Sequence, residues 1–247
     1  MKSESIYGLH AVQALLKSAP QRVQEVYVLV GRNDQRLQKV IQAARSNQIP
    51  LSYKSRKELD TFCDEGNHQG VVALAEPGQT HDESFLFQLL ETQADPLILV
   101  LDGVTDPHNL GACLRTADAA GVHALVTPKD NSAGLNETAR KIACGAAETV
   151  PLIPVTNLAR TLSKLKDKGL WLVGTSGESE LSIYDAPLTG PLVVVMGAEG
   201  KGMRRLTKEH CDHLAYIPMA GSVSSLNVSV ATGVCLFECV RQRQANQ

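Results

Sequence analysis

The stretch that decides the fold is Ser224-Ser225-Leu226-Asn227-Val228-Ser229-Val230-Ala231, near the C-terminus. It follows a short apolar run, residues 214–217, which Pro218 ends because proline cannot donate to a sheet ladder. After Asn227 apolar residues recur at helical spacing, and Asn227 or Ser225 is a suitable N-cap. The sequence therefore predicts a strand, a loop of small polar residues and a helix. The free backbone donors of such a loop suit a polar small molecule, although an ordinary capped helix shows the same pattern.

From residue 96 onward, short apolar runs alternate with segments of helical periodicity. We predict strands over 97–101, 124–126, 152–153, 170–173, 192–196 and 214–217, and helices over 110–120, 137–147, 158–168, 203–209 and 228–243. Continuous apolar strands separated by helices predict an α/β fold, with a parallel sheet and helices on both faces. Ligands bind beyond the C-terminal ends of such strands, which points to the loops at 102–109, 174–177, 197–202 and 218–227.

The N-terminal part predicts a smaller domain. Residues 1–76 suggest strands and helices in a small α/β domain, including a helix capped by Ser55 with Glu58 in a capping box. Residues 77–95 begin with Pro-Gly and carry four acidic residues and no basic one, so we predict a linker with a short helix over 85–90. The second domain then spans residues 96–247.

Composition limits the classes of function. The chain has 247 residues, of which 43% are hydrophobic and 4% aromatic, and its net charge is -2. So few aromatic residues argue against a stacking platform for single-stranded nucleic acid. The six cysteines form no CxxC pair, which predicts free thiols and no metal site. No apolar run approaches membrane-spanning length and no signal region is visible, so we expect a soluble, cytoplasmic protein.

Two further motifs follow predicted strands. The first, residues 106–117, opens a helix with Asn109 as a candidate N-cap and carries Arg115 among apolar neighbours. An arginine there must find acceptors, although a lone arginine on an exposed helix face is the ordinary alternative. The second is Gly197-Ala198-Glu199-Gly200-Lys201-Gly202, whose glycines let the backbone approach a ligand. The glycine spacing matches neither the dinucleotide-binding fingerprint nor a P-loop, so a nucleotide hydrolase is a weak alternative function. A tight turn from strand to helix is the simple structural explanation of the same motif.

Together, these motifs resemble the SpoU branch of the SPOUT methyltransferases, which transfer a methyl group from S-adenosylmethionine to a ribose 2'-hydroxyl in RNA. The resemblance rests on residues 109–112 with 115–117, 196–202, and 217–219 with 225–231, and it covers residues 96–243. Residues 6–8 with 68–71 also resemble the substrate-binding domain of many members, which is similar to ribosomal protein L30e.

The resemblance implies a C-terminal trefoil knot, a homodimer and S-adenosylmethionine as cofactor, with no metal. Within the family, the pattern is most similar to bacterial members that methylate a guanosine of 23S ribosomal RNA. Members that act on transfer RNA share the three motifs and remain an alternative, as does an RNA-binding protein that keeps the fold without catalysis. We expect RNA as a partner, and we expect no binding to DNA or to a membrane.

The resemblance also assigns roles to residues. Arg115 would contact a backbone phosphate and polarise or deprotonate the ribose hydroxyl. Because a guanidinium group stays protonated in proteins, electrostatic positioning is at least as good a role for Arg115 as that of a general base. The residues expected to orient Arg115 and the ribose are Asn109, Glu199, Ser225 and Asn227. The residues expected to hold the cofactor are Gly197, Ile217, Leu226 and Thr175.

Overall fold

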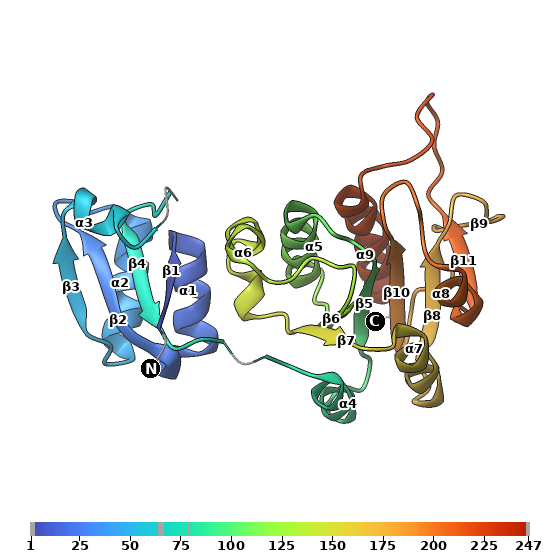
Figure 1. Cartoon of the computed structure of the whole chain (residues 1–247), viewed down its shortest axis with the longest axis horizontal. Coiled ribbons are helices and arrows are strands. Elements are labelled where there is room, and N and C mark those ends of the chain that lie inside the picture. Colours follow the sequence, from blue (N-terminus) through green and yellow to red (C-terminus); the bar gives the residue numbers. More distant parts are fainter. Residues whose placement is uncertain (1–2, 64–66, 79, 246–247) are drawn as a thin grey trace. The chain divides into compact units, whose positions relative to one another are not determined.

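The computed structural model describes residues 3–63, 67–78 and 80–245, and the chain divides into two compact units (Figure 1). Contacts group Met1–Gln79 with the short segment Cys144–Thr149, and Thr80–Ala143 with Val150–Gln247. The boundary therefore falls inside the segment that the sequence predicts to be a linker over 77–95. Each unit has its own sheet.

The sheet of the first unit has four strands in the order β1-β4-β2-β3. Its elements are β1 (Glu4–Tyr7), α1 (Leu9–Ser18), a 3-10 turn (Pro20–Arg22), β2 (Val23–Leu29), α2 (Gln35–Ser46), β3 (Leu51–Lys54), α3 (Arg56–Asp60) and β4 (Val71–Ala75). Apolar residues of α1 and α2 pack on one face of this sheet in a single core. Ser55 and Glu58 form the predicted capping box at α3. The sequence analysis missed β1, a four-residue strand in which only Ile6 is buried.

The sheet of the second unit has seven strands in the order β7-β6-β5-β10-β8-β11-β9, and all of its pairs are parallel. The strands are β5 (Leu97–Asp102), β6 (Ala124–Pro128), β7 (Leu152–Val155), β8 (Trp171–Thr175), β9 (Leu181–Ser182), β10 (Leu192–Gly197) and β11 (His213–Tyr216). The predicted parallel sheet is confirmed, with the two-residue β9 added at its edge.

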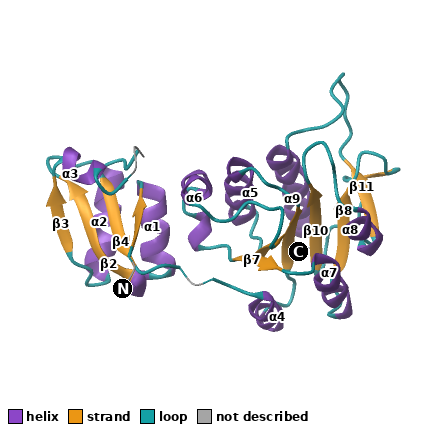
Figure 2. Ribbon diagram, viewed as in Figure 1, coloured by secondary structure: helices purple, strands orange, loops and turns teal. Residues whose placement is uncertain are grey.

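Helices cover both faces of this sheet (Figure 2). Alternate strand residues such as Ile98 and Val100 pack with α4 (Glu83–Thr92) and α7 (Leu158–Asp167) in one core. The intervening residue Leu99 is also fully buried, and it faces the other side because side chains alternate along a strand. The remaining helices of this unit are α5 (Pro107–Ala119), α6 (Glu137–Ala143), α8 (Arg205–His210) and α9 (Val228–Ala245). A 3-10 turn (Ala146–Glu148) lies in the short segment that groups with the first unit.

Helix α4 changes the prediction of a linker over residues 77–95. Asp82 caps this helix by accepting hydrogen bonds from the backbone N–H groups of Ser84 and Phe85. Leu86 and Leu90 are buried in the same core as the strands of the second sheet. The segment from residue 80 to 95 is therefore part of the second unit.

The start of α5 also differs from the prediction. Asp106, and not Asn109, is the N-cap, because its carboxylate accepts a hydrogen bond of 2.9 Å from the backbone N–H of His108. Pro107 takes the first helical position, where its missing N–H costs nothing. Asn109 therefore lies in the first helical turn, with its side chain available for other contacts.

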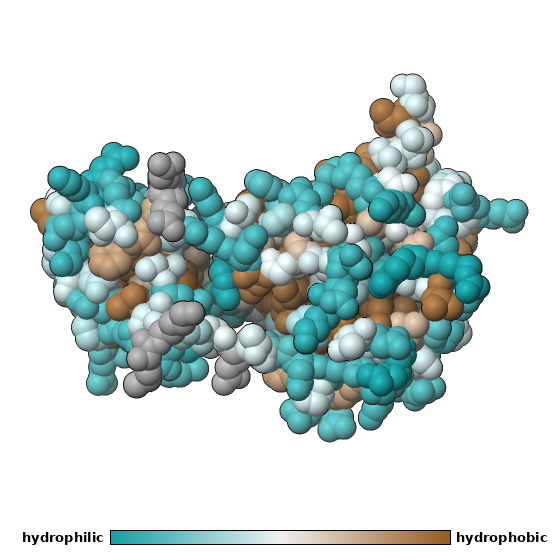
Figure 3. Space-filling view, viewed as in Figure 1, coloured by the Kyte–Doolittle hydropathy of each residue, from teal (hydrophilic) through white to brown (hydrophobic). Residues whose placement is uncertain are grey.

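In the part of the chain that the structure describes, no helix is both long and apolar enough to cross a bilayer. Figure 3 shows a face on which hydrophilic residues surround smaller hydrophobic areas.

An ion pair between the buried Asp102 and the half-exposed Arg204 holds the loop after β10 against the end of β5. Asp102, the last residue of β5, is 1% exposed. Its carboxylate accepts hydrogen bonds from the backbone N–H of Arg204 at 2.8 Å and from the guanidinium Nε at 2.7 Å, and Nη2 lies at 2.6 Å. Within the same loop, the backbone N–H of Ala198 donates to the carbonyl of Gly202 at 3.1 Å, and the N–H of Gly202 donates to the carbonyl of Ala198 at 2.8 Å. The glycine loop is therefore closed on itself and fastened to the neighbouring strand.

We expect Arg204→Ala to lower the free energy of unfolding by about 1–3 kcal/mol, because it removes the side-chain donors of a buried carboxylate and leaves only the backbone bond. Arg205→Ala is the matched control, since Arg205 pairs with Glu209 on the exposed surface of α8, where an ion pair contributes about 1 kcal/mol or less. Urea denaturation of both variants measures the difference. Equal losses in the two variants would contradict a structural role for the Asp102–Arg204 pair.

Candidate active site

Three polar side chains from separate segments of the chain meet beyond the C-terminal ends of the parallel strands. The side-chain amide of Asn227 donates a hydrogen bond of 3.0 Å to Oδ1 of Asn109, and its nitrogen lies 3.5 Å from Oε2 of Glu199. The amide oxygen of Asn227 accepts from the backbone N–H of Ser229 at 2.9 Å and from the Ser229 hydroxyl at 2.6 Å. Asn227 thus caps α9, as predicted, and joins the three sequence motifs at one point.

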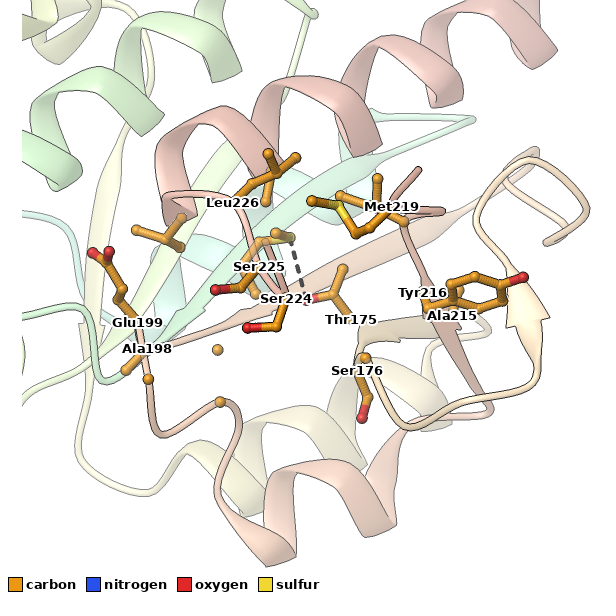
Figure 4. A pocket seen from close by; sticks show the side chains of 18 residues that line it. Thr175, Ser176, Ala198, Glu199, Ala215, Tyr216, Met219, Ser224, Ser225 and Leu226 are labelled. Carbon is orange, nitrogen blue, oxygen red and sulfur yellow. Dashed lines mark hydrogen bonds between the residues drawn. The ribbon is translucent and has the colours of Figure 1, made fainter. Parts of the chain in front are cut away.

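A cavity of about 380 Å³ lies beside this cluster, and we call it the glycine-loop cavity (Figure 4). Figure 4 shows Glu199 and Ala198 at one side and Tyr216 at the other, with Ser224 and Ser225 between them. Its wall comes from the loops after β8, β10 and β11 and from the start of α9. The lining residues are Thr175, Ser176, Gly177, Met196, Gly197, Ala198, Glu199, Gly200, Gly202, Ala215, Tyr216, Ile217, Met219, Ser224, Ser225, Leu226, Val228 and Ala231.

The lining of the glycine-loop cavity suits a ligand with both polar and apolar parts. Methionine, leucine and valine side chains provide apolar surface, and serine hydroxyls and loop backbone provide a few polar groups. A volume of this size is in the usual range for a small-molecule site. Gly197 is required here, because a Cβ at that position would lie 2.3 Å from the carbonyl carbon of Gly202. All four residues predicted to hold a cofactor line this cavity: Gly197, Ile217, Leu226 and Thr175.

A second cavity, of about 470 Å³, shares a wall with the first, and we call it the adjoining cavity. The shared residues are Ala198, Glu199, Gly202 and Val228. The other lining residues are Asp102, Gly103, Val104, Thr105, Asp106, Asn109, Asp130, Asn131, Lys201 and Arg204. Because Glu199 lines both cavities, ligands in the two can approach each other at this carboxylate.

The structure brings four of the five predicted catalytic residues to this place and leaves the fifth apart. Asn109, Glu199 and Asn227 form the hydrogen-bonded cluster, and Ser225 lines the glycine-loop cavity. Arg115 is exposed on α5 and lines neither cavity. Among the described residues, no hydrogen bond or ion pair engages its guanidinium. The expected projection of Arg115 toward the cluster is therefore not seen within this chain.

Helices α5 and α9 pack against each other, and the buried residues Cys113 and Thr232 meet at this contact. The thiol of Cys113 lies 3.5 Å from the hydroxyl of Thr232, and Thr232 in turn donates to the carbonyl of Val228. Burial raises the pKa of the Cys113 thiol to about 11, so at neutral pH it is a protonated, unreactive group. No cluster of metal-ligating side chains is found in the described ranges 3–63, 67–78 and 80–245.

The sequence analysis missed the loop after β6. Asp130 and Asn131 line the adjoining cavity, and both are exposed. The rule that ligands bind beyond the ends of parallel strands, applied to the strand at 124–126, would have pointed to them. The sequence itself shows no motif in this loop.

Comparisons with known proteins identify the family of this chain. The model of the SpoU rRNA Methylase family matches residues 96–237, and a model described as RNA 2'-O ribose methyltransferase substrate binding matches residues 5–81. A protein of Pseudomonas putida named 23S rRNA (guanosine-2'-O-)-methyltransferase RlmB is 62% identical over 245 residues, covering 99% of this chain and 98% of that protein. The protein of the same name from Escherichia coli is 60% identical over 241 residues, with coverages of 98% and 99%.

Solved structures give the same fold. AviRb, a SpoU methyltransferase from Streptomyces viridochromogenes solved in complex with AdoMet, superposes with a TM-score of 0.78 at 22% identity, covering 98% of this chain and 91% of that one. A structure titled RNA 2'-O ribose methyltransferase gives a TM-score of 0.77 at 27% identity, with coverages of 98% and 89%. With a family model that matches more than half of its residues and relatives that align almost end to end, the chain belongs to the SpoU methylase family.

Proposed function

We propose that this protein transfers a methyl group from S-adenosylmethionine to the ribose 2'-hydroxyl of a guanosine in 23S ribosomal RNA. The observation that carries the proposal is the meeting of Asn109, Glu199 and Asn227 beside the glycine-loop cavity. Relatives about 60% identical over the whole chain bear the name of this activity, which favours ribosomal over transfer RNA. A binding role without catalysis would not need all three side chains at one point.

The glycine-loop cavity fits S-adenosylmethionine by its size and its lining. Backbone groups of Gly197, Ile217 and Leu226 would hold the adenosine part, with Thr175 close to it. The absence of side chains at the glycines allows a flat ring to lie against the backbone. When bound, the cofactor supplies a methyl group on a positively charged sulfur, and the protein must only bring the acceptor oxygen into line with it.

The cluster at the shared wall supplies that positioning. A ribose hydroxyl is a poor nucleophile until its proton is shared or removed. The carboxylate of Glu199 is an acceptor at the wall between the two cavities, and Asn227 fixes it from one side. Asn109 is held by the same amide, and Ser225 lies on the loop that leads to Asn227. These residues would orient the ribose, and no metal is required.

Arg115 keeps a role in this proposal as a partner for RNA phosphate. Its guanidinium is exposed on α5, and no described residue bonds to it. Planar guanidinium groups bind phosphate through two parallel hydrogen bonds. Contact with the phosphate next to the target ribose would place positive charge near the hydroxyl and favour loss of its proton.

We also propose a homodimer, supported by an apolar stripe on α9. Val230 and Phe237 are 54% and 51% exposed, and seven residues, about two helical turns, separate them on one face. Exposed apolar side chains at such spacing are typical of a helix that packs against another chain.

A trefoil knot in the C-terminal part remains our proposal from the family resemblance. It is supported by the glycine loop and the segment 217–226 lining one cavity.

The first unit would bind the RNA substrate, and its resemblance to ribosomal protein L30e is part of this proposal. The substrate-binding family model covers residues 5–81, close to the predicted domain over 1–76. A polar hollow in this unit is lined by Arg32, Arg56, Asn67, His68 and Gln69, together with Leu29, Asp60 and Gly70. Arginine and amide side chains are common contacts to RNA backbone and bases. A ribosomal RNA substrate is consistent with a cytoplasmic location.

We expect the purified protein to bind S-adenosylmethionine in the presence of a metal chelator, and to restore one 2'-O-methylguanosine in 23S ribosomal RNA from cells that lack it. Calorimetry measures the binding, and mapping of 2'-O-methyl sites measures the modification. Asn227→Ala should weaken both, because it releases Glu199, Asn109 and the start of α9 together. Binding without any methylated site in 23S ribosomal RNA would contradict the proposed substrate.

We expect Arg115→Ala to leave cofactor affinity nearly unchanged and to slow methyl transfer by about two to four orders of magnitude, the range for a group that assists proton removal. Arg115→Lys should restore little, since an ammonium group lacks the planar fork. Single-turnover methylation at saturating RNA is the measurement, and Arg160→Ala, on the exposed face of α7, is the control. A wild-type rate in Arg115→Ala, or a loss of cofactor binding, would refute this role.

We expect Phe237→Asp to weaken dimerisation at least tenfold, because burial of a carboxylate in an apolar contact is costly. Sedimentation over a range of concentrations measures the dissociation constant. Leu206→Asp, at a residue 51% exposed on α8, is the control and should leave it unchanged. A monomeric wild-type protein, or an equally stable dimer of the Phe237→Asp variant, would show that this face of α9 is not the interface.

A further inference from the structure

We propose that the adjoining cavity receives the base of the target nucleotide, and that Asp130 selects guanine by accepting hydrogen bonds from its N1–H and N2–H groups. This inference rests on the proposed function and adds a residue that determines specificity. It concerns the loop after β6, which contributes nothing to the glycine-loop cavity.

The reaction determines where the ribose and the base of the target nucleotide must lie. The acceptor oxygen must come within bonding distance of the methyl group, so the ribose has to lie at the wall that the two cavities share. Glu199 and Val228 belong to that wall, and Asn109 lines the adjoining cavity next to it. The base is attached to the ribose by one bond, and the adjoining cavity is the hollow on the far side of this wall. Its volume of about 470 Å³ accommodates a group of that size.

The charges of the lining disfavour a phosphate in this cavity. Four carboxylates and two cations line it: Asp102, Asp106, Asp130, Glu199, Lys201 and Arg204. Arg204 is engaged by the buried carboxylate of Asp102, which leaves Lys201 as the one cation of the lining without a described partner. An anion would meet more negative than positive charge here, whereas a base that donates hydrogen bonds would not.

Asp130 is the carboxylate of the lining that is free to meet such a base. Asp106 accepts from the backbone of His108, and its Oδ1 lies 3.1 Å from Nδ1 of the same histidine. Those contacts hold the pKa of Asp106 below its usual range. Glu199 belongs to the shared wall. No described residue bonds to the carboxylate of Asp130, which is exposed at the rim of the cavity.

The chemistry of base edges then selects guanine. The Watson–Crick edge of guanine presents two neighbouring N–H donors, and a carboxylate accepts both at once. Adenine and cytosine each offer one amino group beside an acceptor nitrogen, which a carboxylate would repel, and uracil offers one N–H between two carbonyl groups. Proteins that recognise unpaired RNA bases commonly hydrogen-bond to this edge. Asn131, the next residue of the lining, carries an amide group that can donate a hydrogen bond to guanine O6.

The loop that carries Asp130 is fixed on both sides. The backbone N–H of Lys129 donates to the carbonyl of Val155 at 2.8 Å, and that of Ala133 donates to the carbonyl of Val104 at 2.8 Å. Between these anchors, Asn131 adopts a left-handed backbone with φ of 57°, which asparagine tolerates better than most residues. A short loop tied to β7 and to the loop after β5 holds its side chains in place before RNA arrives.

The test compares guanosine with inosine, which lacks the 2-amino group, at the mapped methylation site of a ligated 23S ribosomal RNA. With wild-type protein, we expect single-turnover methylation of the inosine RNA to be at least tenfold slower. Asp130→Asn should slow methylation of the guanosine RNA by a similar factor and should lose the distinction between the two. Asp167→Asn, on the exposed end of α7, is the control and should behave as wild type. Cofactor binding should be equal in all three proteins.

The outcomes separate the inference from the proposed function. Wild-type protein that methylates neither RNA would refute the proposed function and the inference with it. Two other results would refute only the inference that Asp130 recognises the base and would leave the proposed function standing. One is wild-type protein that methylates both RNAs at the same rate, and the other is an Asp130→Asn variant that keeps the wild-type preference for guanosine. Loss of cofactor binding in Asp130→Asn would also overturn it, because the effect would then come from a disturbed fold.

Discussion

The site depends on the side-chain amide of Asn227, which satisfies three demands with one group. Its oxygen accepts from the N–H and hydroxyl of Ser229 and so starts α9, while its nitrogen donates to Asn109 and faces Glu199. A shorter side chain would not reach both sides, and a carboxylate would repel Glu199 and lack the donor. The start of the last helix and the arrangement of the other two loops are thus set by the same hydrogen bonds.

That amide can act only because the sheet brings the loops together. Strands β5 and β10 are neighbours in parallel register, with Gly197 opposite Asp102, so the loops that follow them leave the sheet at the same level. The ion pair of Asp102 with Arg204 then joins these loops a second time. Both faces of the sheet are buried under helices, so neither strand can shift without exposing apolar surface. The stability of the core therefore fixes the spacing of the polar groups.

Sequence periodicity predicted what depends on local chemistry and missed what depends on contacts far along the chain. The six longer strands of the second sheet and the capping box of α3 follow from apolar runs and from Ser55 and Glu58. The helix α4 was assigned to a linker, because its acidic composition hides that Leu86 and Leu90 pack on the sheet. The four residues that the family resemblance assigns to the cofactor all line one cavity. Arg115 did not join the cluster, because helical spacing does not tell which face of α5 turns outward.

The glycine loop explains why two cavities can lie so close together. Gly197 approaches Gly202 so closely that no side chain fits between them, and Ala198 and Gly202 close the loop by two backbone bonds. A turn this thin forms a wall with one cavity on each side, and Glu199 projects from the same turn. A bulkier loop would separate a methyl donor from its acceptor, and a looser one would not hold a carboxylate between them. In the proposed function, this thin turn would therefore also set the distance between the methyl donor and its acceptor.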